Sequence, residues 1–239
     1  MKSLDVNRSP QSRRERPAKP ALTRQGIIDA ALTFLRDEGL NKVTMRRIAT
    51  ALDTGAASLY VYVRNTEDLH AQILDALLGS IHRPEPSAGT WRDRLKALLT
   101  SYVMILFEYP EIARMAMSTQ PSGPNYLSLA EAILALLSEG GVPDREAAWA
   151  VDLLLLYATA NAAEQSNRKE SPQAAKDFLA EFSSLSMAIA TADAGSYPHI
   201  ARLGDELLSG GPIRIQWGLD VLLSGILATP RPDATQDGG

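Results

Sequence analysis

Residues 43–62, with the sequence VTMRRIATALDTGAASLYVY, constrain the architecture of this chain more than any other segment. Thr44 is a favourable N-cap, and apolar side chains then fall on one side of a short helix: Met45, Ile48, Ala49 and Leu52. Asp53-Thr54-Gly55 interrupts the pattern, and Thr54 can cap another short helix that continues through Tyr62. Two short helices joined by a tight turn are typical of a helix-turn-helix, whose second helix enters the DNA major groove. Such pairs also occur in proteins that do not bind DNA.

The flanking residues extend the helical pattern on both sides. Thr23 can cap a helix that ends at Gly39 and carries apolar side chains on one face: Ile27, Ala31, Phe34 and Leu35. Asn65 or Thr66 can cap a longer helix, whose first turn holds Glu67 and Asp68, where the helix dipole favours acidic groups. We therefore predict a helix-turn-helix domain over residues 21–81, preceded by a disordered basic arm at 1–20.

The rest of the chain predicts a larger helical domain over residues 82–228 and a disordered tail at 229–239. A junction rich in proline and small polar residues ends at Thr90, and we expect helices near 91–108, 110–118, 125–139, 144–165, 172–191, 198–208 and 212–228. Prolines stand where first-turn prolines belong, at Pro110, Pro143, Pro172 and Pro212. No segment has the period-2 alternation of a strand. The fold class predicted is all-α.

Composition excludes several classes of function. The 239 residues include no cysteine, which removes disulfides, thiolate metal sites and cysteine nucleophiles. The three histidines, His70, His82 and His199, are widely separated, so we find neither a catalytic pair nor a metal cluster and expect no enzyme and no cofactor. No stretch approaches the ~20 apolar residues of a membrane span, and residues 1–20 lack the apolar segment of a secretory signal. We expect a cytoplasmic protein without a membrane partner.

Charge is distributed unevenly. Residues 1–70 carry 12 Lys and Arg against 8 Asp and Glu, whereas residues 71–239 carry 12 against 20. A basic front on an acidic body hints at a polyanion partner confined to one end, although an excess of a few charges can also arise by chance.

Residues 22–69 resemble the tetracycline-repressor (TetR) family. The residues that carry this resemblance are Leu22-Thr23-Arg24, Ile27, Ala30-Ala31, Phe34, Gly39-Leu40, Val43 to Ala49, Ser58 to Asn65, and Leu69. A weaker similarity to the C-terminal domain of the tetracycline-repressor type lies in Tyr197-Pro198-His199-Ile200 and in Gly218 to Gly225. The resemblance implies a three-helix DNA-binding domain followed by a helical domain for ligand binding and dimerisation.

The resemblance implies these DNA-binding residues: Thr23, Thr44, Arg46, Ala56, Ala57, Ser58, Tyr60, Tyr62 and Arg64. Thr44 at a helix N-terminus can meet a phosphate, and Tyr60, Tyr62 and Arg64 offer further phosphate or base-edge donors. Arg46 is favoured over Arg47 as the side chain that reads a guanine, since one of the two is expected to be a solvated surface residue. Ser58 can bond either base type, and Ala56 and Ala57 can meet a thymine methyl group.

Two positions depart from the family pattern. Thr66 stands where family members usually carry a lysine, which puts one phosphate contact in doubt. The second helix begins with the small residues Gly55-Ala56-Ala57, which leave few long side chains for base edges. The arm with Arg13, Arg14 and Arg16 could compensate in the minor groove, or it could be dispensable.

The larger domain is expected to form the homodimer. Gly218 and Gly225 share a helical face with Val221 and Leu222, and an interior glycine costs ~1 kcal/mol, so we interpret them as a close crossing with a second subunit. Leu154 lies in a helix that is apolar almost all round and is assigned to the same interface, with burial inside one chain as the alternative.

A ligand pocket is implied by the resemblance, and its residues are harder to identify. Candidates are Tyr102, Met104, Phe107, Met115, Met117, Trp149, Tyr157 and Asn161, although most such side chains at helical spacing belong to a core. The partners expected are a double-stranded DNA operator, a largely apolar small-molecule effector and a second copy of the chain. The leading hypothesis is a ligand-responsive repressor; an activator of the same architecture, or a helical interaction module with weakened DNA binding, stays open.

Overall fold

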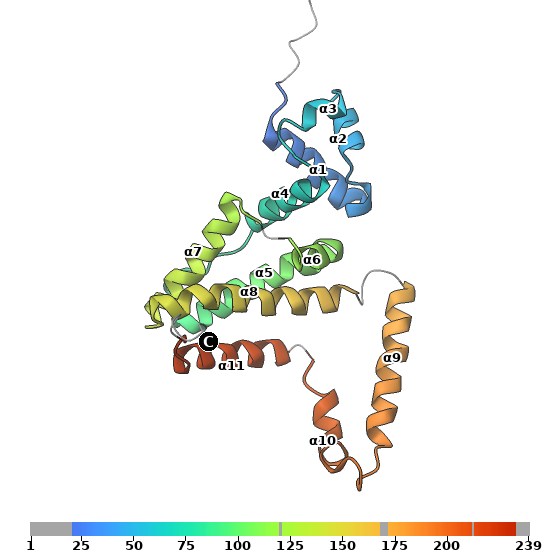
Figure 1. The fold of residues 1–239 in the computed structure, drawn as a ribbon, viewed down its shortest axis with the longest axis vertical. Coiled ribbons are helices and arrows are strands. Elements are labelled where there is room, and N and C mark those ends of the chain that lie inside the picture. The colour runs from blue at the N-terminus through green and yellow to red at the C-terminus, as the bar shows by residue number, and fades with distance from the viewer. Residues whose placement is uncertain (1–20, 120, 168–171, 212, 233–239) are drawn as a thin grey trace, which may run out of the picture.

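A computed structural model describes residues 21–119, 121–167, 172–211 and 213–232 (Figure 1). Within these ranges the chain forms eleven α-helices and one 3-10 helix and no strand, which confirms the all-α prediction. The arm at 1–20 and most of the predicted tail, from residue 233 onward, lie outside the described residues. None of the described helices is long and apolar enough to cross a membrane.

The N-terminal helices form a small unit with its own core. Its elements are α1 (Arg24–Glu38), η2 (Leu40–Lys42), α2 (Met45–Ala51), α3 (Ala56–Leu59) and α4 (Thr66–Leu78). Large apolar side chains of this unit are fully buried: Ile27, Ile48, Leu59, Leu69 and Ile73. The predicted caps are present, because the side chains of Thr23, Thr44 and Asn65 accept hydrogen bonds from Gly26, Arg47 and Asp68 backbone N–H groups. These caps fix where α1, α2 and α4 begin.

The turn of the helix-turn-helix differs from the expectation. Asp53 takes a positive φ of 47° and turns the chain, and Gly55, without a side-chain hydrogen bond, occupies the N-cap of α3 in place of Thr54. Asp tolerates the left-handed region better than most residues, which permits this tight turn. α3 ends at Leu59, and a turn continues through Tyr62. η2 was not predicted.

The body is built around α5 (Trp91–Glu108) and α8 (Asp144–Asn167). α6 (Pro110–Ala116), α7 (Pro124–Glu139) and α11 (Ile213–Ala228) pack around them (Figure 1). The predicted ranges agree to within about two residues, the usual spread of helix ends. Buried leucines of α5 meet α8 through a shared core that includes Leu95, Leu99, Leu106, Leu154 and Ala158.

α9 (Pro172–Ala190) and α10 (Pro198–Leu208) form a hairpin that projects from the body (Figure 1). α10 packs along α9, yet none of the described side chains of either helix is buried. Large apolar side chains remain exposed along the pair: Leu179, Phe182, Leu185, Met187, Leu203 and Leu207. The hairpin therefore contributes almost nothing to the core of its own chain.

Candidate nucleic-acid interface and regulatory cavity

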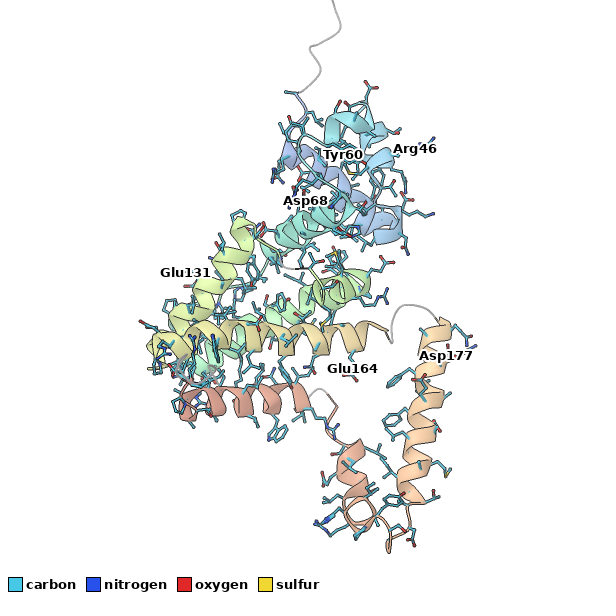
Figure 2. All side chains as sticks on the ribbon, viewed as in Figure 1. Arg46, Tyr60, Asp68, Glu131, Glu164 and Asp177 are labelled. Atoms are coloured by element: carbon cyan, nitrogen blue, oxygen red, sulfur yellow. The ribbon has the colours of Figure 1, made fainter. Side chains whose placement is uncertain are left out.

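The outer surface of α2 and α3 collects most of the predicted DNA-binding residues. Thr23, Thr44, Arg46, Ala57, Ser58, Tyr60 and Arg64 are exposed, and Ala56 and Tyr62 are partly buried. Arg46 and Tyr60 lie at the end of the molecule farthest from the α9–α10 hairpin (Figure 2). Thr44 uses one oxygen lone pair to cap α2, which leaves its hydroxyl proton available to a phosphate.

The two neighbouring arginines of α2 have different surroundings. The Arg47 guanidinium donates to both Glu38 carboxylate oxygens, at 2.6 and 2.9 Å, and lies 4.4 Å from the centre of the Phe34 ring. The hydrogen bond to Glu38 raises the pKa of Arg47, and the same bond lowers the pKa of Glu38. Within the described chain no hydrogen bond or ion pair holds the Arg46 guanidinium. This contrast favours Arg46 over Arg47 as the side chain free to read a base.

Tyr62 has a role that the sequence did not predict. Its hydroxyl donates to the Leu22 carbonyl oxygen at 2.7 Å, and its own carbonyl oxygen accepts from the Gln72 side chain. The hydroxyl proton is used inside the chain, which argues against the expected function as a phosphate donor and assigns Tyr62 to the support of α1.

The positive charge expected at this end comes from the arm. Residues 21–70 carry six Lys and Arg and six Asp and Glu. The whole excess of positive charge in residues 1–70 therefore comes from residues 1–20, which lie outside the described residues. Arg64 is partly neutralised as well, because its backbone N–H and guanidinium both donate to Asp68. Burial opposes ionisation of Asp68, but hydrogen bonds from Arg64 and Gln72 outweigh it and lower the pKa of Asp68.

A cavity of about 250 Å³ opens in the body between α4, α5, α7 and α8. It is lined by Leu74, Leu78, Tyr102, Ala116, Met117, Ser118, Thr119, Pro121, Tyr126, Asp152, Leu155, Leu156 and Thr159. Two of the eight predicted pocket residues, Tyr102 and Met117, are among them. Sequence reasoning missed Tyr126 and Thr159 as pocket residues, because nothing in their local pattern separates them from other residues on helices.

The other predicted pocket residues lie elsewhere. Met104 is exposed on α5, and Phe107 and Met115 pack at the edge of the core. Asn161 donates to the Tyr157 carbonyl oxygen at 2.7 Å, and the Tyr157 hydroxyl donates toward the Arg214 carbonyl oxygen at 3.3 Å. These contacts give Asn161 and Tyr157 structural roles, and neither residue is among those that line this cavity.

A wide apolar groove of about 780 Å³ runs between α8 and α11. Three of the five predicted interface residues, Val221, Leu222 and Gly225, line it, together with Trp149, Leu153, Leu156 and Ile226. Trp149 was expected in the ligand pocket and instead lies in this groove, with the Arg231 guanidinium 4.1 Å from its ring centre. Apolar side chains exposed on two adjacent helices make this groove the natural contact face for another helical surface.

Two predicted interface residues are corrected. Leu154 has none of its surface exposed and belongs to the core of its own chain. Gly218 faces Tyr157 of the same chain, and a Cβ there would overlap the Tyr157 hydroxyl. The close helix crossing inferred from Gly218 exists, but it lies between α11 and α8 within one chain.

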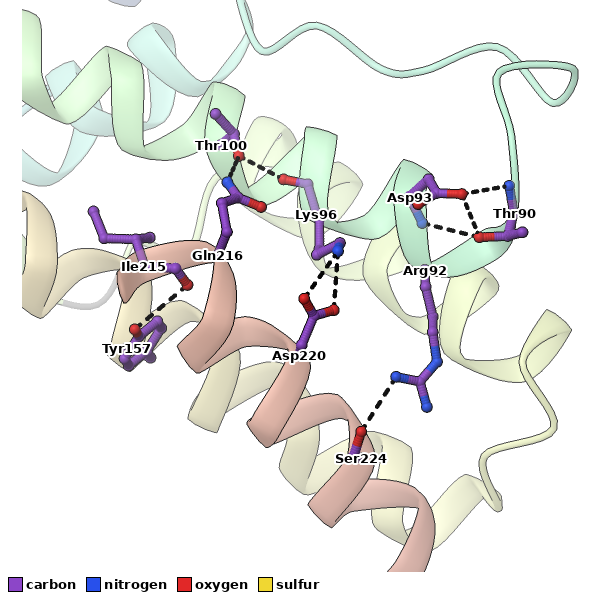
Figure 3. Close-up of polar contacts among 10 residues, drawn as sticks. All are labelled: Thr90, Arg92, Asp93, Lys96, Thr100, Tyr157, Ile215, Gln216, Asp220 and Ser224. Carbon is purple, nitrogen blue, oxygen red and sulfur yellow. Dashed lines mark hydrogen bonds and ion pairs between the residues drawn. The ribbon is translucent and has the colours of Figure 1, made fainter. Parts of the chain in front are cut away.

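Polar contacts fix α11 against α5 (Figure 3). Lys96 pairs with both carboxylate oxygens of Asp220 at 2.9 and 3.2 Å, and the Arg92 guanidinium donates to the Ser224 hydroxyl at 3.4 Å. Gln216 donates to the Thr100 hydroxyl oxygen at 3.2 Å. Leu219 and Leu223 of α11 are buried in the core, and the side of α11 that carries Val221, Leu222 and Gly225 is left along the groove.

Hydrogen bonds to two carboxylates help to connect the N-terminal unit to the body. The Glu111 carboxylate, at the start of α6, accepts from the Leu40 backbone N–H at 2.6 Å and from the Asn41 side chain at 3.0 Å. The buried Asp75 carboxylate of α4 accepts from the Tyr126 backbone N–H at 2.8 Å, and so caps α7. Gly123 is required there, because a Cβ would overlap Asp75. α4 thus packs against α1 in the N-terminal unit and also lines the cavity.

Comparison with protein families finds matches to two separate parts of the chain. Residues 27–73 match the family described as bacterial regulatory proteins, tetR family. Residues 83–229 match the tetracyclin repressor-like C-terminal domain. No group of histidine, cysteine, aspartate and glutamate suited to a metal ion occurs among the described residues.

Individual relatives span the chain to different extents. An HTH-type transcriptional regulator of Saccharopolyspora erythraea is 33% identical over 123 residues, which are 52% of this chain and 52% of that protein. The HTH-type transcriptional repressor DrrR1 of Streptomyces coeruleorubidus is 28% identical over 93% of this chain and 82% of that protein.

Solved structures extend the similarity to the fold. A crystal structure described as a transcription regulator from Streptomyces coelicolor is 46% identical, covers 91% of this chain and 100% of that chain, and gives a TM-score of 0.74. ActR from Streptomyces coelicolor, solved in complex with actinorhodin, is 34% identical over 87% of this chain and 97% of that chain, with a TM-score of 0.75.

Proposed function

Because this chain belongs to the tetracycline-repressor (TetR) family of transcription regulators, we propose that it is a ligand-responsive repressor that binds a palindromic operator as a homodimer. One observation carries the proposal: α4, which packs against α1 in the same unit that exposes Arg46 on α2, also lines a cavity in the body, and Arg46 has no partner among the described residues. The relatives support it, since DrrR1 is named a repressor and ActR was solved with actinorhodin bound.

In the proposed complex, α3 enters the major groove and α2 lies across its edge. Arg46 donates to a guanine, Ser58 and Tyr60 add polar contacts, and Ala56 and Ala57 allow close approach to a thymine methyl group. Thr23, Thr44 and Arg64 bind phosphates and set the register. Because residues 21–70 are neutral overall, the arm at 1–20 supplies much of the attraction to the polyanion.

The proposed dimer forms through the groove between α8 and α11. Trp149, Leu153 and Val221 are large, apolar and exposed there, and a second copy would cover them with its own α8 and α11 in a two-fold arrangement. The α9–α10 hairpin supports a dimer as well, because its apolar side chains find no core within the described part of their own chain. Two α3 helices then meet successive major grooves about 34–36 Å apart.

Effector binding changes the distance between the two α3 helices of the dimer, and α4 transmits this change. The residues after α6 line the cavity and lead directly to the α7 N-terminus, which Asp75 of α4 caps. A ligand that moves this part of the cavity wall displaces α4, and the rest of the N-terminal unit moves with it. The shift in operator affinity equals the difference in the ligand's affinity for the two arrangements.

The test is selection of genomic DNA fragments by the purified full-length protein, repeated with two arginine variants. Arg46→Ala removes the proposed base contact, and Arg83→Ala removes the same side chain at an exposed position between α4 and α5, outside the proposed DNA and dimer contacts. We expect the native protein and Arg83→Ala to enrich one palindromic site and Arg46→Ala to lose it, by a factor of about 10–100 in affinity. A folded dimer that enriches no site at low salt would refute the repressor and favour an interaction module.

A further inference from the structure

The cavity that we assign to the effector presents hydrogen-bond acceptors more than donors. The Thr159 hydroxyl donates to the Leu155 carbonyl oxygen at 2.7 Å, one helical turn back along α8. The Tyr102 hydroxyl lies 2.7 Å from the Thr159 oxygen. Since Thr159 has already used its only proton, Tyr102 must be the donor in this pair. Both protons are therefore committed, and only oxygen lone pairs remain for a ligand.

One further group follows the same pattern. The Ser118 hydroxyl donates to the Met115 carbonyl oxygen at 3.2 Å, which again leaves an acceptor. Burial raises the pKa of Tyr102, although the bond to Thr159 opposes the rise, so Tyr102 keeps its proton at neutral pH. Tyr126 differs, because its hydroxyl can rotate and either donate or accept.

Charge in the cavity has one sign. Asp152 is the charged side chain among its described lining residues, and no lysine, arginine or histidine is found among them. Asp152 interrupts the apolar face of α8 and stands at the rim that the cavity shares with the α8–α11 groove. The remaining wall is largely apolar, through Leu74, Leu155 and Met117. An anion would meet Asp152 without a compensating cation, whereas a protonated amine would find a carboxylate and several acceptors.

We propose that the effector is a compact aromatic cation, with its amine against Asp152 and a ring N–H or hydroxyl donor toward Tyr102. The volume of about 250 Å³ suits a ligand smaller than a typical drug, with two or three fused rings. This inference rests on the proposed function only in taking the cavity as the effector site, and its test requires no DNA.

The test compares two flat three-ring probes of opposite charge by titration calorimetry on the full-length protein. Proflavine is a cation, and 9-anthracenecarboxylate is an anion of similar size. We expect proflavine to bind at least about tenfold more tightly, and Asp152→Asn to remove about tenfold of its affinity. Tyr102→Phe should weaken proflavine less, because it removes one acceptor and leaves the charge.

A matched control tests whether the loss of proflavine affinity comes from the charge of Asp152 or from any loss of negative charge on the protein. Glu131→Gln removes one carboxylate from α7, outside the cavity lining, and should leave proflavine affinity unchanged (Figure 2). The proposal fails if the anion binds as tightly as the cation, if proflavine does not bind at millimolar concentration, or if Asp152→Asn changes only the dimerisation constant. These results leave the selection of DNA fragments unaffected, so a repressor with a different effector stays distinguishable from a chain that does not bind DNA.

Discussion

The N-terminal unit and the region from α8 to α11 differ in how far their large apolar side chains are exposed. Residues 21–81 bury Ile27, Ile48, Leu59 and Leu69 within one chain. By contrast, α8, α9, α10 and α11 expose many of theirs, including Trp149, Phe182 and Trp217. Monomeric proteins rarely leave such large apolar areas in contact with water. We infer that the first unit is complete as a monomer, whereas the second is completed by another copy of the chain.

The largest expected effect comes from a charge placed in the α8–α11 groove. Leu153 is 41% exposed and lines this groove, so Leu153→Arg would force an unpaired cation into the proposed interface. We expect a monomer at micromolar concentration and a loss of at least about a hundredfold in operator affinity, since the two half-sites are no longer linked. Sedimentation measures the mass, and fluorescence anisotropy measures the affinity.

The control for this variant carries the same substitution elsewhere. Leu127, on α7, is 61% exposed and outside the groove, so Leu127→Arg should leave both mass and affinity unchanged. If Leu153→Arg remains a dimer with native affinity, the second copy binds another face, and the contrast between the two regions would need a different explanation.

An intermediate effect is expected where α4 meets α7. A methyl group at Gly123 would overlap Asp75, so Gly123→Ala must push this buried carboxylate away from the Tyr126 N–H that it caps. Overpacking costs about 1–3 kcal/mol, and the exposed helix end adds to it, so we expect a loss of about 3 kcal/mol in unfolding free energy. Urea unfolding measures this change.

Gly55→Ala provides the comparison in the N-terminal unit. Gly55 has a φ of −81°, and no atom lies within 4 Å of the place that an alanine methyl group would take. Alanine is a poorer N-cap than glycine but lowers the conformational entropy of the unfolded chain, and because the two effects oppose each other, stability should change by about 0.5 kcal/mol or less. Equal losses for the two variants would show that α7 is not held by Asp75 in the way the geometry indicates.

The same contrast explains which features could be predicted from the sequence. Caps and prolines are local, so Thr23, Thr44, Asn65 and Pro110 gave helix starts that the structure confirms. Periodicity says which residues share a helix face but not which neighbour covers that face. For this reason Gly218 and Leu154 were assigned to a partner subunit, although both pack inside the chain.

The cavity was harder to predict, because it is defined by what several helices leave unfilled. Methionine and aromatic residues were the main sequence indication, and they also fill cores and the α8–α11 groove, as Trp149 does. Asp152 had the clearest local signal, a charge in an apolar helix, yet its position at the rim follows only from the packing of α8 against α5, α6 and α7.

The smallest expected effect is a pH dependence within the N-terminal unit. The pKa of Asp68 is lowered from its ordinary value of 3.8, because hydrogen bonds from Arg64 and Gln72 outweigh the effect of burial. As the pH falls below about 4, the unfolded chain takes up this proton before the folded chain does, so the stability that Asp68 contributes at neutral pH is lost. The side chain is near the surface, which limits this contribution to about 1 kcal/mol or less. Asp68→Asn should therefore flatten the fall in thermal stability between pH 5 and pH 3. Asp37→Asn, which removes an exposed carboxylate of α1, should leave the native slope in place. Equal slopes for native protein and Asp68→Asn would mean that the Arg64 and Gln72 contacts contribute nothing to the folded unit.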